Sequence, residues 1–182
     1  MNFSPEQRLI VSLLCDIHQK LEIADSFDSQ LISDAINTRN DWAIGMLYGD
    51  SLGDTSGLGE ECLFVCNVLN MSECIETSFA QMDAAQQTET RRLTDFNPER
   101  VFFGFDGNNE THLMSIARFL VTRMDKFTHF TGREFNSHMP SVDAYKRMLG
   151  AFNQVMDRGN FGPLGPQEVA FVMNEMRHPD NR

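Results

Sequence analysis

The first half of the chain has few basic residues. Residues 1–90 hold 3 basic and 15 acidic residues, a net charge of −12, whereas residues 91–182 hold 12 basic and 11 acidic residues, a net charge of +1. A protein that binds nucleic acid usually has a basic face, so we do not expect direct nucleic-acid binding. The acidic half is typical of a solvated surface. Two alternatives stay open: an acidic face that meets a basic protein or mimics nucleic acid, and association between the two unlike halves.

Long apolar runs and a cysteine framework are also missing. No run approaches the roughly 18 to 20 apolar residues that span a bilayer. Residues 1–6 have neither the basic segment nor the apolar segment of a signal peptide. The 4 cysteines show no tight spacing pattern, which is typical of reduced thiols. We therefore expect a cytoplasmic protein without a membrane segment, folded as a single domain of 182 residues.

Motifs of known chemistry are absent as well. The sequence has no Gly-x-Ser-x-Gly, phosphate loop, His-Glu-x-x-His or dinucleotide fingerprint. The glycine-rich run 49–59 lacks the Asp spacing and closing Glu of a calcium loop, and we interpret it as a flexible connector. Cys62, Cys66 and Cys74 share a helix face, but structural zinc sites usually use Cys-x-x-Cys turns, so we expect core packing. No metal or cofactor is predicted.

What the sequence does contain is apolar spacing of three and four residues, the signature of helices. We predict helices over residues 5–23, 29–38, 42–48, 58–82 (the longest), 141–158 and from 166 onward. Another is predicted to begin near Asn108 or Asn109 and to reach Met124. The prediction is an all-α multihelical bundle of about six helices, with N-terminal helices in 1–48, a loop in 49–59 and the main body in 60–182.

The first of these helices has the clearest start and the clearest stripe. Ser4 suits the N-cap, Pro5 the first helical position and Gln7 the return bond of a capping box. Its apolar stripe consists of Leu9, Ile10, Leu13, Leu14, Ile17 and Leu21. Such stripes must be covered by one another or by a second copy of the chain, and we expect self-association.

Residues 101–149 are the stretch around which the chain is organised. Phe102, Phe103 and Phe105 are too many rings for an exposed loop, so we expect them to be buried. Gly104 between them would relieve backbone strain or permit a close approach. Residues 127–139 break the helical period and carry further rings and histidines, which predicts a loop held in place by its aromatic side chains.

This stretch resembles the YfbU family of bacterial proteins. The residues that carry the resemblance are Phe102, Gly104, Phe105, Asp106, Arg118, Phe119, Thr128, His129, Phe130, Phe135, Asn136, Pro140, Tyr145 and Arg147. Weaker matches lie in residues 7–10 and 167–169. The resemblance implies an all-helical fold and homo-oligomers, and it implies no catalytic residue because the family has no assigned activity. The run 49–59 and the three clustered cysteines depart from the family pattern.

Weak catalytic candidates are Asp106, Arg118 and His129. They belong to a polar set that could converge near one loop, together with His112, Arg133, Asn136 and His138. An acid–base pair of Asp106 and His129 would need hydrogen-bond reach and a pocket. The ordinary alternative is that Asp106 caps a turn or pairs with an arginine, and that His129 donates to a carbonyl. We therefore favour an interaction or regulatory role in a homo-oligomer, and keep as alternatives a small-molecule-binding enzyme and an acidic partner or nucleic-acid mimic.

Overall fold

The computed structural model describes residues 3–24, 26–53, 57–159, 162–178 and 180. These residues form helices and no strand, which confirms the all-α prediction; the helices are α1 (Pro5–Lys20), α2 (Ser29–Asn37), α3 (Trp42–Leu52), α4 (Glu60–Gln81), α5 (Ala84–Leu93), α6 (Thr111–Thr122), α7 (Val142–Met156) and α8 (Pro166–Met173), with the 3-10 turns η1 (Thr128–Phe130) and η2 (Asn174–Met176). None of the described helices is both long enough and apolar enough to cross a membrane.

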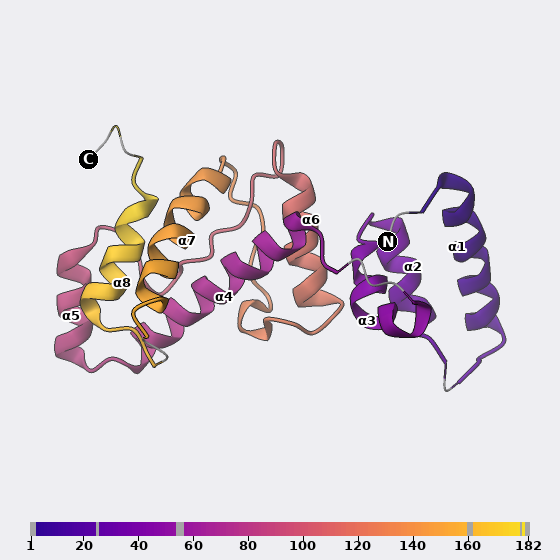
Figure 1. Ribbon diagram of the computed structural model, residues 1–182, viewed down its shortest axis with the longest axis horizontal. Helices are drawn as coiled ribbons and strands as arrows, with labels where there is room; N and C mark the ends of the chain where they lie inside the picture. Colours follow the sequence, from indigo (N-terminus) through magenta and orange to yellow (C-terminus); the bar gives the residue numbers. More distant parts are fainter. Residues whose placement is uncertain (1–2, 25, 54–56, 160–161, 179, 181–182) are drawn as a thin grey trace.

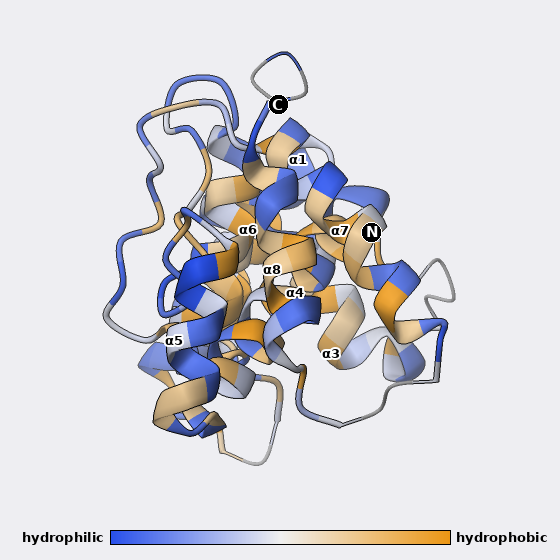
Figure 2. Ribbon diagram, turned by 90° about the vertical axis from the view of Figure 1, so that its left-hand side faces the viewer, coloured by the Kyte–Doolittle hydropathy of each residue, from blue (hydrophilic) through white to orange (hydrophobic). Residues whose placement is uncertain are grey.

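The helices fall into two groups along the long axis (Figure 1). The N-terminal unit, α1 to α3, lies at one end, with α1 outermost, and the body, α4 to α8, fills the rest. In the body, α4 contacts α6, α7 and α8, and α5 packs on α8. Figure 2 shows hydrophobic stretches of α4 and α8 in the middle of the body and a largely hydrophilic α5 at its edge. The sequence predicted α4 to be the longest helix, and α6, α7 and α8 of the body pack on it.

Among the described residues, three polar or aromatic contacts join side chains of the N-terminal unit to α6. The Asn40 side-chain amide donates to the Ser115 hydroxyl over 3.0 Å. The Trp42 and Phe119 rings meet edge to face, with centroids 6.0 Å apart. The third contact is an ion pair between Arg123 and Asp34. One face of α6 therefore serves the N-terminal unit, while Leu113, Ile116, Ala117, Leu120 and Val121 on its other face are buried in the body.

Several boundaries differ from the sequence prediction. α1 ends at Lys20, short of residue 23, and α3 runs on to Leu52, so Gly49–Leu52 is helix and not loop. Within the predicted connector, residues 54–56 lie outside the described part. The polar segment after α4, where no helix was predicted, forms α5, because Asp83 and Gln86 make a capping box that stabilises a helix with little apolar surface. α6 begins at Thr111, since Asp106 holds Asn108 and Asn109 in a turn.

Candidate functional site

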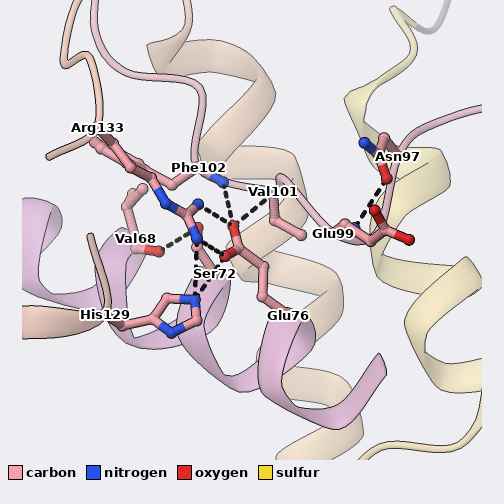
Figure 3. Close-up of polar contacts among 9 residues, drawn as sticks. All are labelled: Val68, Ser72, Glu76, Asn97, Glu99, Val101, Phe102, His129 and Arg133. Atoms are coloured by element: carbon pink, nitrogen blue, oxygen red, sulfur yellow. Dashed lines mark hydrogen bonds and ion pairs between the residues drawn. The ribbon is translucent and has the colours of Figure 1, made fainter. Parts of the chain in front are cut away.

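A buried carboxylate lies at the centre of the body. Glu76 of α4 is 4% exposed, and Figure 3 shows its side chain reached by Val101 and Phe102 from one segment and by His129 and Arg133 from another. The Val101 and Phe102 amides donate to Oε1 over 2.7 and 3.2 Å. Arg133 donates to both oxygens, over 3.0 and 2.6 Å, and Nε2 of His129 lies 2.7 Å from Oε2. We call this arrangement the Glu76 cluster.

The Glu76 cluster keeps its carboxylate ionised. Burial alone would raise the pKa of Glu76, but the hydrogen bonds from Arg133, His129 and the Phe102 amide outweigh it, and the pKa lies below its ordinary value of 4.5. The side chains of His129 and Arg133 are 29% and 23% exposed, so both partners reach solvent while the carboxylate does not. Both oxygens of the carboxylate are already bonded, which makes the cluster a cross-link between segments rather than a free base.

Aromatic rings surround this cluster on the side of α7. Tyr145 is fully buried and stacks on Phe103 with ring centroids 4.7 Å apart, and Phe102 meets Phe130 at 5.2 Å. The Phe103 amide donates to the Tyr145 hydroxyl over 3.0 Å, and burial raises the pKa of Tyr145. Phe102 and Phe105 are buried as predicted, while Phe103 is half-buried. The rings fix the loop that carries His129.

The predicted close approach at Gly104 is present. Gly104 has φ +95°, and a Cβ there would lie 2.4 Å from the Phe135 carbonyl oxygen. Directly beyond it, the Phe105 amide donates to the same carbonyl over 2.9 Å, and the Ser137 amide returns a bond to the Phe105 carbonyl over 3.1 Å. These two bonds form a parallel bridge between Phe105 and Asn136. Only glycine permits both the left-handed backbone and the contact.

A second buried carboxylate, Glu110, holds the start of α7. It accepts from the Asp106, Ser141 and Val142 amides over 2.9, 2.9 and 3.0 Å, and from the Ser141 hydroxyl over 2.6 Å. Burial opposes ionisation, but the Ser141 hydroxyl and the amides outweigh it and lower the pKa of Glu110. Asp106 accepts from the Asn108 amide and the Asn109 side chain, which lowers its pKa too. Asp106 therefore does cap a turn, the ordinary alternative from the sequence.

The predicted polar set divides among separate places. His129 and Arg133 meet at Glu76. Asn136 accepts from the Gly107 and His138 amides over 2.9 Å each, beside Asp106. His112 pairs with Glu61 at 3.1 Å. Arg118 lines a cavity on α6, with Met114 beside it. The described contacts give Asp106, Arg118 and His129 different partners, so they do not form one constellation.

Sequence reasoning did not single out Glu76. The available signal was local: Glu76 follows Ser72 by four residues and precedes Phe79 by three, and both are buried. A carboxylate in a buried stripe needs a cation. His129 and Arg133, which are four residues apart, were available in the sequence as the partners of this carboxylate.

The clustered cysteines stay thiols in the described structure. Cys62 and Cys66 share a hydrogen bond that, with burial, raises the pKa of Cys62, and the same bond lowers the pKa of Cys66. Cys62 is 2% exposed and belongs to the core. Within residues that the structure describes, no group of three His, Cys, Asp or Glu side chains is arranged to hold a metal ion.

A different feature marks the other end of the molecule. The predicted stripe of α1 lies open: Leu9, Ile10, Leu13, Leu14, Ile17 and Leu21 are 53–66% exposed. Instead, α1 turns a mixed face toward α2, with Cys15 buried and Val11, Ser12 and His18 half-buried. Arg8 on this inner face donates to Asp41 and to the Ile36 carbonyl. We call the six open side chains the α1 face.

The molecule thus presents an internally satisfied polar centre in the body and an uncovered apolar helix in the N-terminal unit. The predicted capping box of α1 is present, with the Gln7 amide donating to Ser4 and the Ser4 amide donating to Gln7. The helix itself is therefore well specified, and its exposed face is a property of the fold rather than of a frayed end.

The sequence model of the YfbU domain matches residues 1–175, nearly the whole chain, so the chain belongs to the YfbU family.

Proposed function

We propose that this protein works as a homo-oligomer in an interaction or regulatory role, with the α1 face of one copy packed against the α1 face of another. One observation carries the proposal. The more apolar face of α1 points to solvent, while its less apolar face packs on α2. Contiguous exposed apolar surface of this kind marks interaction sites in folded proteins.

The gain from covering the α1 face is large enough to hold two copies together. Full burial of a Leu or Ile side chain contributes roughly 1.5–3 kcal/mol, so six side chains that are each about half exposed contribute roughly 5–9 kcal/mol per chain. Two chains supply twice this amount. Association costs on the order of 4–15 kcal/mol in lost freedom of motion, which the apolar gain can offset.

Charge placement favours a second copy as the occupant. Glu6 and Lys20 each lie seven residues, or two helical turns, from Leu13. If two α1 helices pack antiparallel with their two-fold axis at Leu13, Glu6 of each copy meets Lys20 of the other. Leu9 then meets Ile17. A two-fold interface requires such self-complementarity, and α1 provides it in the placement of its charged and aliphatic side chains.

The charges of α1 also argue against a membrane surface as the occupant. Helices that lie in a bilayer interface are usually rich in Lys and Arg on the polar face. α1 has Glu6 and Asp16 against Arg8 and Lys20, and Arg8 is already paired with Asp41. The acidic excess of residues 1–90 supports the same conclusion. A basic protein partner for that acidic surface stays an alternative, with salt-sensitive binding as its mark.

Light scattering with a matched pair of variants tests the proposal. Leu13→Glu places a charge at the centre of the α1 face, and Phe171→Glu places the same charge at an exposed ring on α8, at the other end of the molecule. We expect the wild type and Phe171→Glu to be oligomers at micromolar concentration and Leu13→Glu to be a folded monomer. A monomeric wild type, or an oligomer that survives Leu13→Glu, would contradict the proposal.

A further inference from the structure

A cavity lies where the N-terminal unit meets the body. It has a volume of about 470 Å³ and is lined from one side by Asp34, Thr38 and Asn40, and from the other by α6. The lining positions on α6 include Met114, Arg118 and Thr122, which recur every four residues and so share one face. This is the face that the body leaves free. The volume falls in the range of small-molecule sites.

Arg118 at the cavity has no carboxylate partner in the part of the chain that the structure describes. Among the described residues, the one polar partner of the Arg118 guanidinium is the Met114 sulfur, 4.0 Å away. Arg123 at the same cavity is paired with Asp34, so that pair adds no net charge. The lining therefore has a net charge of +1 in a chain whose net charge is −11. A single negative charge is the complement of this cavity.

The rest of the lining supplies an apolar wall and fixed polar groups. Met114 and Phe119 provide apolar surface beside Arg118. Asn40 is 1% exposed and donates to the Thr38 and Ser115 hydroxyls over 2.8 and 3.0 Å, which holds both hydroxyls in place at the cavity. Small-molecule sites typically combine such apolar walls with a few placed polar groups.

We propose that this cavity binds a small organic monocarboxylate, with its carboxylate on Arg118 and its apolar part against Met114 and Phe119. An arginine can hold a carboxylate by two parallel hydrogen bonds. A dianionic phosphate fits less well, because Asp34 lies in the same lining and the net charge is only +1. The site does not involve the α1 face, so this proposal can be tested independently of the oligomer proposed above.

Benzoate is a suitable probe, and amide chemical shifts in the isotope-labelled full chain report where it binds. We expect millimolar benzoate to shift the amides of Ser115, Arg118 and Phe119. Arg118→Gln should weaken the affinity about tenfold, because one charge-assisted bidentate contact is lost. Arg92→Gln is the matched control, because Arg92 pairs with Glu89 on the exposed surface of α5. This control variant should bind benzoate with the same affinity as the wild type.

The outcomes separate clearly. Shifts spread over the surface, no shift at all, or equal affinity in Arg118→Gln would each overturn the proposal. Inorganic phosphate that binds as tightly as benzoate would overturn the apolar part of it. Arg118 is exposed, so its replacement should leave the fold intact, and an unchanged melting temperature checks this. Arg118→Glu, which reverses the charge, should remove detectable benzoate binding.

Discussion

The two ends of the molecule treat their side chains in opposite ways. The body draws even a carboxylate, Glu76, into its interior and bonds both oxygens. The N-terminal unit leaves Leu13 and its five apolar neighbours of the α1 face in solvent. Helix α1 has a complete capping box and a regular apolar stripe, yet that stripe is exposed. Local sequence signals therefore do not decide which surface of a helix is covered. The buried polar groups of the body find their partners within one chain. We infer that the exposed apolar side chains of the N-terminal unit are covered by a second chain.

Removal of the Glu76 carboxylate should have the largest effect on the body. Glu76→Ala leaves Arg133, His129 and two buried amides without their acceptor, and we expect a loss of about 3–5 kcal/mol in the free energy of unfolding. Urea unfolding followed by circular dichroism measures it. Glu99→Ala, at an exposed carboxylate paired with Arg91, should stay within about 0.5 kcal/mol of wild type. Equal effects at both positions would mean that the Glu76 cluster does not hold the body together.

Two glycines of the body should respond in opposite directions to alanine. Gly104→Ala puts a methyl group against the Phe135 carbonyl at a positive φ, and we expect a loss of about 1–3 kcal/mol in unfolding free energy. Gly150→Ala lies on the exposed face of α7 with open space around its Cβ, and should gain up to about 1 kcal/mol. Thermal unfolding of both variants provides the measurement. A neutral Gly104→Ala would show that the bridge at Phe105 is not tight.

Acid should destabilise the body through Glu76 and Glu110, two of its buried carboxylates. The pKa values of Glu76 and Glu110 are lowered on folding, so their contribution is complete above about pH 4.5 and is lost as the pH falls through the lower folded values. We expect the urea concentration at the unfolding midpoint to decrease as the pH is lowered below 4.5. Just above pH 4.5, this midpoint should vary little with pH. Glu76→Gln, already neutral, should show a shallower fall. An identical pH profile in the variant would mean that Glu76 does not titrate with unfolding.

The smallest effect concerns the charges at the ends of α1. Glu6→Lys alone, or Lys20→Glu alone, should weaken the oligomer a few-fold by placing like charges together, and the double variant should restore it. Sedimentation over a dilution series measures this, and the effect should shrink in high salt. Single variants that bind as well as the wild type would point to a different packing of the α1 face.

How far the sequence predicts this molecule depends on the range of the interactions. The course of α4 follows from its apolar period, and the start of α1 follows from Ser4, Pro5 and Gln7, because both are local. The direction in which the α1 face points does not follow, since it depends on which of two faces α2 covers. The bonds at Glu76 join residues 25 to 57 positions apart, and no helical pattern contains that pairing. α5 was missed because it has only one buried residue, Thr90, and a cap alone is a weak signal.

The most direct test of the central claim places a cysteine at the proposed two-fold axis. In an antiparallel pair centred on Leu13, the two copies of this residue face each other, so Leu13→Cys should form a disulfide-linked dimer under mild oxidation. Phe171→Cys, at an exposed position on α8, and the wild type with its four thiols should stay unlinked. Reduction should return Leu13→Cys to the 20.7 kDa chain on a denaturing gel. A Leu13→Cys protein that links no better than Phe171→Cys would contradict the pairing of the two α1 faces.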